Sequence, residues 1–267
     1  QVYDGQQLRE MIRAQIVDPT SPATYRAKAL THGAGVKGGP RPMPKMGDEI
    51  APADADLLAR CGDFDGKPLH FGGPDSAFTL DVKTNWKLAI ENYFESYHLP
   101  WVHPGLNSYS RLEDHYHMIE TSFAGQGSTA YTPGFGPGGE RFAIFPGLSE
   151  KWSKGAEYPT FFPNALLGFQ NDHFFAMIVE PVSHERSLEH VAIYYASEDT
   201  LGERFAAMRA RNAGLWKGIF EEDISVVEGM QHGRHAPGFD GGKFAPAMDG
   251  PTHAFHCWVA RRFLEAA

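Results

Sequence analysis

"HFFAMIVEPVSHERSLEHVAIYYA", residues 173–196, decides the fold class of this chain. It contains two runs rich in β-branched and aromatic residues, separated by the polar tetrapeptide SHER, which predicts an antiparallel hairpin. Outward from it, residues 76–83 (SAFTLDVK) predict another strand. Residues 201–231 and 252–267 predict two helices near the end of the chain. Strands followed by helices favour an α+β domain, with helices packed on an antiparallel sheet.

The composition limits the classes of partner. The 267 residues are 42% hydrophobic and 21% charged, which is ordinary for a globular protein. The formal net charge of −9 argues against nucleic acid or an anionic membrane as a partner, because both attract clustered Lys and Arg. No apolar run approaches the roughly 18 residues that span a bilayer, and we expect no signal peptide. Cys61 and Cys257 make no disulfide framework, so we expect a cytoplasmic protein.

The beginning of the chain differs in character from the rest. Residues 31–49 (THGAGVKGGPRPMPKMGDE) are dense in Gly and Pro and indicate a linker or an exposed loop. Residues 5–16 predict a short helix. We therefore expect an N-terminal segment, 1–72, that is partly loop or linker, followed by the main domain, 73–267.

A second stretch, "ENYFESYHLPWVHP" (residues 91–104), concentrates polar chemistry. On a helix over residues 85–98, Glu91, Glu95 and His98 fall on one face. Pro100 is expected to end that helix, so that a turn brings His103 back towards His98. Two imidazoles converging in this way could bind a metal ion, or both could be helix-end residues bonded to backbone carbonyls; the spacing alone does not decide.

A third metal ligand is sought in "WKGIFEEDISVVEGMQHG", residues 216–233. Asp223 lies among apolar positions of this predicted helix, whereas Glu221 and Glu222 are expected to face outward. Two histidines and one carboxylate would suit non-haem Fe(II) and oxygen chemistry. The alternative for Asp223 is a solvated acidic turn.

At these residues the chain resembles a known family. "NWKLAIENYFESYHLPWVHP" (85–104) resembles the mononuclear iron motif of Rieske non-haem iron oxygenase α subunits, and "EEDISVVEGMQHG" (221–233) is similar to the second signature, an Asp eight residues before a Gln. Residues 159–190 and 254–266 are similar to the central strands and the closing helix of that family. The resemblance implies a helix-grip-like catalytic domain over residues 73–267.

The resemblance also implies roles for individual residues. His98, His103 and Asp223 would be the ligands of a mononuclear Fe(2+). Glu95 would be the bridging acid between this iron and a Rieske cluster on a neighbouring subunit. Asn92 matches an Asn near the iron, and Glu91 would be supporting or structural.

One departure from the family is large. A Rieske [2Fe-2S] cluster needs a Cys-x-His and a Cys-x2-His pair, and neither Cys61 nor Cys257 stands in such a pair. We therefore expect this chain to be the catalytic part of a longer protein that carries the cluster. The family resemblance implies O2 and a small organic substrate, either an aromatic compound or a quaternary amine. It also implies a reductase or ferredoxin as electron donor and a homotrimer.

The substrate pocket is less well predicted than the metal site. Aromatic and polar residues of the central segment are candidates, although core packing would explain most of them equally well: Tyr131, Phe161, Phe162, Asn164, Leu166 and Phe169. Two other functions remain open, a non-catalytic α+β domain that binds a small molecule and a zinc hydrolase that uses the same three ligands. The remaining candidate histidines are expected not to be ligands: His115, His117, His232, His253 and His256.

Overall fold

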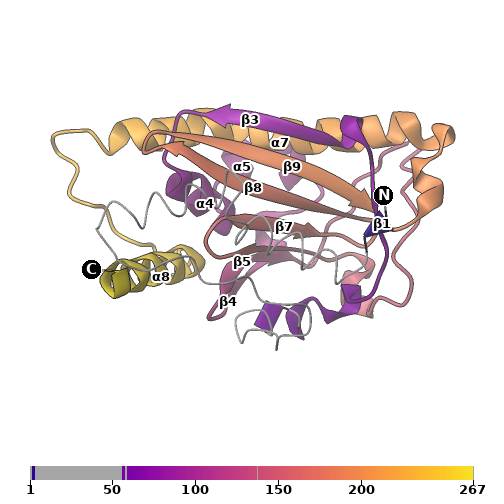
Figure 1. Ribbon diagram of the computed structural model, residues 1–267, viewed down its shortest axis with the longest axis horizontal. Helices are drawn as coiled ribbons and strands as arrows, with labels where there is room; N and C mark the ends of the chain where they lie inside the picture. Colours follow the sequence, from indigo (N-terminus) through magenta and orange to yellow (C-terminus); the bar gives the residue numbers. More distant parts are fainter. Residues whose placement is uncertain (1, 4–55, 58, 137, 267) are drawn as a thin grey trace.

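One antiparallel sheet organises the molecule (Figure 1). The computed structural model describes residues 2–3, 56–57, 59–136 and 138–266. Within them the sheet has nine strands: β1 Val2–Tyr3, β2 Leu69–Phe71, β3 Ala77–Val82, β4 His115–Ile119, β5 Phe123–Ser128, β6 Ala156–Phe161, β7 Ala165–Phe169, β8 His173–Ser183 and β9 Arg186–Tyr195. Their order is β1-β2-β9-β8-β7-β6-β5-β4, and β3 pairs with β9 beside β2.

The predicted hairpin is the longest pairing of the sheet. Strands β8 and β9 pair antiparallel from His173 opposite Tyr195 to Ser183 opposite Arg186. Strand β3 then adds to the free edge of β9, with Ala77 opposite Ala192. The predictions of the hairpin, of the strand within residues 76–83 and of an antiparallel α+β fold are therefore confirmed.

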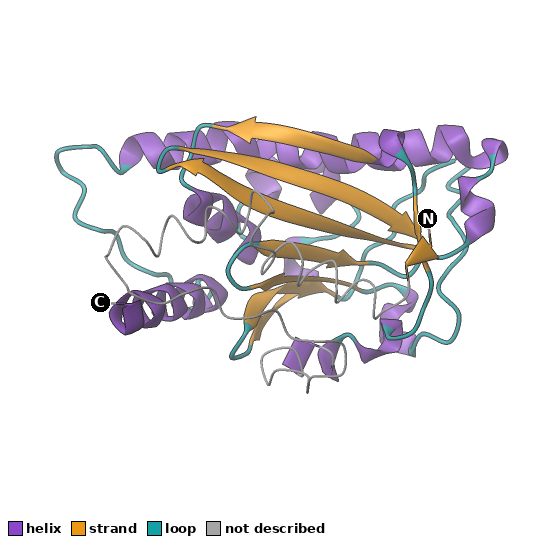
Figure 2. Cartoon of the chain, in the orientation of Figure 1, coloured by secondary structure: helices purple, strands orange, loops and turns teal. Residues whose placement is uncertain are grey.

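Both faces of the sheet are buried. Side chains of successive strand residues point to opposite sides of the sheet, and each side packs into a core of its own. In β7, Leu166 belongs to a core shared with the helices, whereas Leu167 and Phe169 belong to a second core on the other face. Figure 2 shows the longest helix lying along the sheet. The central strands are consequently apolar almost throughout rather than alternating in polarity.

Five α-helices follow β3 within the described residues, and all but the second of them contribute side chains to the core that lies on the helices' side of the sheet. They are α4 Trp86–Phe94, α5 Leu99–Val102, α6 Pro104–Asn107, α7 Ala206–Gly233 and α8 Gly250–Ala266. Helix α7 was expected to begin at Leu201, but two short 3-10 turns, Glu198–Leu201 and Glu203–Phe205, precede it. No helix among the described residues is long and apolar enough to cross a membrane.

Residues just before position 73 pack against the second core. The ring of Phe64 lies edge-on to Phe145 and Trp152, at centroid distances of 5.3 and 4.7 Å. The guanidinium of Arg60 donates to Glu157, which is 2% exposed, at 2.8 Å. Residues 60–71 therefore contribute to the sheet's packing. The predicted helix 5–16 and the predicted linker 31–49 lie outside the described residues.

Candidate metal centre

The start of α4 is fixed to the C-terminal part of α7. Asn85 caps α4, since its side chain accepts from the backbone N–H two residues on (3.1 Å), and its own N–H donates to Oε1 of Gln231 (2.8 Å). The hydroxyl of Thr84 donates to the carbonyl oxygen of Val227 (3.1 Å). Gln231 is the glutamine of the second sequence motif. The two motifs therefore touch, and this contact brings Asp223 beside the end of α4.

The end of α4 differs from the prediction. The helix ends at Phe94, because the backbone of Glu95 is extended, and it does not reach His98. Pro100 does not end a helix; it lies in the first turn of α5, where its missing N–H costs no hydrogen bond. His98 precedes α5 and His103 follows it. One short turn of helix therefore separates the two imidazoles, whose ring centroids lie 5.1 Å apart.

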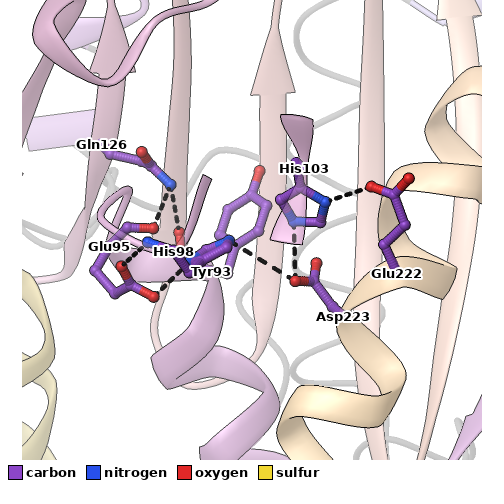
Figure 3. Close-up of polar contacts among 7 residues, drawn as sticks. All are labelled: Tyr93, Glu95, His98, His103, Gln126, Glu222 and Asp223. Carbon is purple, nitrogen blue, oxygen red and sulfur yellow. Dashed lines mark hydrogen bonds and ion pairs between the residues drawn. The ribbon is translucent and has the colours of Figure 1, made fainter. Parts of the chain in front are cut away.

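Asp223 completes a group of three ligand atoms (Figure 3). Its Oδ1 lies 2.9 Å from Nε2 of His103 and 3.7 Å from Nε2 of His98. One ligand atom from each of the three residues lies within 4.8 Å of the others. Among the described residues this is the group of His, Cys, Asp and Glu side chains that could hold a metal ion. It consists of the three residues that the sequence motifs predicted.

Each imidazole is held from behind by a carboxylate. Nδ1 of His98 contacts Oε1 of Glu95, whose Oε2 also accepts from the backbone N–H of His98 (3.3 Å). Nδ1 of His103 contacts Oε2 of Glu222 at 2.7 Å. Because Nδ1 is engaged in both rings, both Nε2 atoms face Asp223 (Figure 3).

Glu222 faces outward, as the sequence predicted, but it also makes a contact that the sequence did not predict. Its side chain is half exposed, yet its carboxylate reaches His103, which is 2% exposed. Burial lowers the pKa of His103, but the hydrogen bonds and charges of Asp223 and Glu222 outweigh it and raise that pKa above its ordinary value. A proton on this imidazole must leave before a metal can bind there, so metal affinity rises with pH.

A second polar chain supports the segment that carries Glu95. The amide of Gln126 on β5 donates to the backbone carbonyls of Tyr93 (3.2 Å) and Glu95 (3.0 Å). Its Oε1 lies 2.7 Å from Nδ1 of His115, whose Nε2 lies 3.0 Å from the hydroxyl of Ser110. Burial lowers the pKa of His115, which favours a neutral ring. Sequence reasoning found none of these supporting roles, since the residues match no motif.

A cavity of about 50 Å³ adjoins the three ligands. Asn92, which the resemblance had placed near the iron, is one of its lining residues. The wall is mainly aromatic and aliphatic. The other lining residues besides the ligands are Tyr93, Leu99, Leu106, Ser110, His115, Gln126, Tyr158, Trp216, Ile219 and Phe220.

The six residues predicted from sequence for a substrate pocket lie outside this lining. Tyr131 stacks behind Trp216, with ring centroids 6.0 Å apart. Phe162 packs on Phe255 of α8, and the amide of Asn164 donates to the carbonyl of a neighbouring strand. The other three lie within the two cores or against them: Phe161, Leu166 and Phe169.

Glu91 lies apart from the three ligands. Its carboxylate contacts Nε2 of His256 on α8 (2.8 Å) and the guanidinium of Arg234 just beyond α7 (3.3 Å). The side chain is 10% exposed. Glu91 therefore links α4 to α8 and to the residue that follows α7, which agrees with a structural role.

Residues 73–265 match the ring hydroxylating alpha subunit (catalytic domain) family. The chain belongs to this family. Its fold is that of the Rieske oxygenase catalytic domains, as two solved structures show. A quaternary ammonium Rieske monooxygenase is similar with a TM-score of 0.57 and 19% identity, covering 79% of this chain and 54% of that one. Dicamba monooxygenase is similar with a TM-score of 0.51 and 14% identity, covering 86% and 66%.

Two curated relatives have related sequences. The oxygenase subunit of carnitine monooxygenase from Acinetobacter baumannii is 26% identical over 168 residues, covering 61% of this chain and 42% of the relative. Putrescine 2-hydroxylase from Ralstonia nicotianae is 28% identical over 224 residues, covering 76% and 57%. The chain spans about half the length of these relatives.

Proposed function

We propose that this chain is the catalytic part of a Rieske-type non-haem iron oxygenase, which uses O2 to hydroxylate or demethylate a small organic substrate. The observation that carries the proposal is the convergence of His98, His103 and Asp223 within 4.8 Å, in a chain of the ring hydroxylating family. Two imidazole nitrogens and one carboxylate oxygen are a donor set that suits Fe(II).

The residues present fit this metal. Bound iron would supply the redox chemistry of oxygen activation and would keep coordination positions open beside the three protein ligands. The chain's own contribution is orientation. Glu95 and Glu222 engage Nδ1 of the two histidines, which fixes each ring and leaves Nε2 as the ligand atom. Aromatic and aliphatic side chains make up much of the cavity wall beside these polar groups.

Glu95 is proposed as the bridging acid to a Rieske [2Fe-2S] cluster held by a neighbouring subunit. What supports this role is the contact of its carboxylate with Nδ1 of His98, one of the three proposed ligands. A ferredoxin or reductase would donate the electrons, a homotrimer would bring cluster and iron together, and the enzyme would be cytoplasmic. The cluster would be held outside the residues described here.

The cavity favours a small amine as substrate. Its walls include Tyr93, Tyr158, Trp216 and Phe220, whose rings can attract an organic cation, and Asp223 supplies negative charge nearby. A volume of about 50 Å³ suits a methyl or methylene group better than an aromatic ring, since a cavity of roughly 150 Å³ holds benzene. The carnitine and putrescine enzymes named above act on amines, which supports the same class. An aromatic compound is the second candidate.

Metal and sulfide content of the full-length protein tests the proposal. We expect about three irons and two acid-labile sulfides per chain, one iron for this site and two for the cluster. Asp223→Ala should leave about two irons in a folded protein, whereas Glu221→Ala, an exposed neighbour on the same helix, should change nothing. Glu95→Gln should keep all iron but lose coupled turnover. Zinc at the site would instead support a hydrolase, and a metal-free native protein a binding domain.

A further inference from the structure

A buried polar chain runs from the surface to the wall of the cavity. The guanidinium of Arg141 donates to Oδ2 of Asp172 at 3.0 Å, and Oδ1 of Asp172 lies 2.7 Å from Nδ1 of His173. The indole Nε1–H of Trp216 donates to Nε2 of His173 at 2.9 Å. Asp172 and His173 are both fully buried, and Arg141 is 24% exposed. This series of hydrogen bonds ends at Trp216, which lines the cavity beside the three proposed ligands.

The chemistry of the donors fixes the protonation of this chain. An indole N–H can only donate, so Nε2 of His173 must accept. Nδ1 of the imidazole therefore carries a proton, which it donates to Asp172. Burial raises the pKa of Asp172, but His173 and the guanidinium of Arg141 outweigh it and hold that pKa below its ordinary value. An ionised carboxylate thus sets the tautomer that Trp216 needs.

Helix α7 places the side chains of Trp216 and Asp223 in the wall of the same cavity. Residues 216, 220 and 223 follow an i, i+4, i+7 spacing, so their side chains share one helix face. Seven residues at 1.5 Å each separate Trp216 from Asp223 by about 10 Å along the axis. The indole is also held by its faces, since Tyr131 and Phe220 lie near-parallel to it at centroid distances of 6.0 and 5.7 Å. Trp216 is therefore a wall of the cavity at a fixed distance from Asp223.

Burying an indole in this fold does not by itself require such a series of buried polar groups. Among the described residues the buried Nε1 of Trp86 has no hydrogen-bond partner, and Trp152 uses only one carboxylate, Asp63, at 2.9 Å. Burying an ionised aspartate together with a histidine costs desolvation that an apolar core would avoid. That cost indicates a requirement for the orientation of Trp216 rather than for its burial.

We propose that Asp172 and His173 are positioning residues that lock the indole of Trp216 as the end wall of the substrate cavity, and that this wall limits the length of the group that reaches the metal ligands. The proposal rests on the cavity being the substrate site of the proposed function. Arg141 acts at the outer end of the chain by keeping Asp172 ionised.

The test uses the full-length protein with [15N-indole]-tryptophan, in which Trp216→Phe identifies the resonance of interest. Asp172→Asn offers an amide that can donate to Nδ1 of His173, which would place the proton on Nε2, facing the indole N–H. We expect exchange of the Trp216 N–H with solvent to become at least tenfold faster. Asp63→Asn, which makes the same carboxylate-to-amide change at the partner of Trp152, is the matched control and should leave Trp216 unchanged. Arg141→Gln, at the partly exposed end, serves if Asp172→Asn does not fold.

Binding of two pairs of probes then reads the length limit: tetramethylammonium against hexyltrimethylammonium, and benzene against butylbenzene. In the wild type the shorter member of at least one pair should bind tenfold or more tightly than the longer, and Asp172→Asn should reduce this ratio below threefold. An unchanged ratio, unchanged N–H exchange, or no binding of either pair would overturn the proposal. Length discrimination in a protein that binds no iron would refute the proposed oxygenase function and leave this positioning role standing.

Discussion

Glu222 offers the sharpest test of the metal centre, because its contact was absent from the sequence prediction. Its carboxylate lies 2.7 Å from Nδ1 of His103, a ring that is otherwise buried. Glu222→Gln keeps the shape of the side chain and a carbonyl oxygen that can still accept a proton from Nδ1. What it removes is the negative charge that makes the imidazole a better ligand.

The expected size of the effect follows from the exposure of Glu222. Loss of such a supporting partner commonly costs 10- to 100-fold in metal affinity, which is roughly 1.4 to 2.7 kcal/mol. Because the side chain is 50% exposed, solvent screens its charge, and the lower end applies. We therefore expect metal binding to weaken about tenfold.

Glu221→Gln is the matched control. Glu221 is also 50% exposed and loses the same charge, but its carboxylate faces Lys217 at 3.6 Å instead of a metal ligand. Metal-free protein would be titrated anaerobically with Fe(II) and, for a spectroscopic signal, with Co(II). The two variants should differ about tenfold in dissociation constant. Equal weakening in both would assign the effect to net charge, and no weakening in Glu222→Gln would refute the orienting role.

Three further variants test a buried carboxyl near Asp223, the second core and the cap of α4. Glu189 on β9 has a pKa raised to about 8 by burial and by the charge of Asp223, so in metal-free protein its carboxyl holds a proton that the unfolded chain releases near pH 4.5. Native stability should therefore fall as pH rises from about 5 to 8 in the wild type, and urea denaturation should show a smaller fall, by a few kcal/mol at most, in Glu189→Gln. Phe64→Ala should lower the free energy of unfolding by about 3–5 kcal/mol, against less than about 0.5 kcal/mol for the exposed Phe263→Ala; equal effects would contradict the packing of residues before position 73. Asn85→Ala should cost about 1 kcal/mol through loss of the helix cap, and a thermal midpoint equal to that of the wild type would count against that cap.

Interactions between residues close in sequence were predictable. The hairpin of β8 and β9 needs only two β-rich runs joined by a short turn, and Asn85 caps α4 through a backbone N–H two residues away. The family resemblance, rather than the spacing alone, pointed to His98, His103 and Asp223, and the structure brings these three residues together. The prediction that Pro100 ends a helix was wrong, because this proline lies in the first turn of α5. A proline is excluded from a helix interior yet suits a first turn, and sequence spacing alone does not distinguish the two positions.

Contacts between distant residues were not predictable. Glu222 meets His103 across 119 positions of sequence, and no local pattern distinguishes it from Glu221 one residue earlier. The six predicted pocket residues are aromatic and apolar, as a pocket requires, but the same properties suit a core. Which of the two they enter depends on how the helices cover the sheet.

The amino-acid sequence by itself determined the residue types of the metal ligands, the strand and helix periodicities and the motif that places the chain in its family. The folded chain determined which carboxylates orient the histidines, which rings wall the cavity and how Trp216 is held 10 Å or so along α7 from Asp223. The physical reason is the distance along the sequence over which each interaction acts. Backbone preferences and caps act over a few residues, whereas a site of this kind is formed by side chains that meet only after a nine-stranded sheet, counted over the described residues, has brought α4, α5 and α7 together.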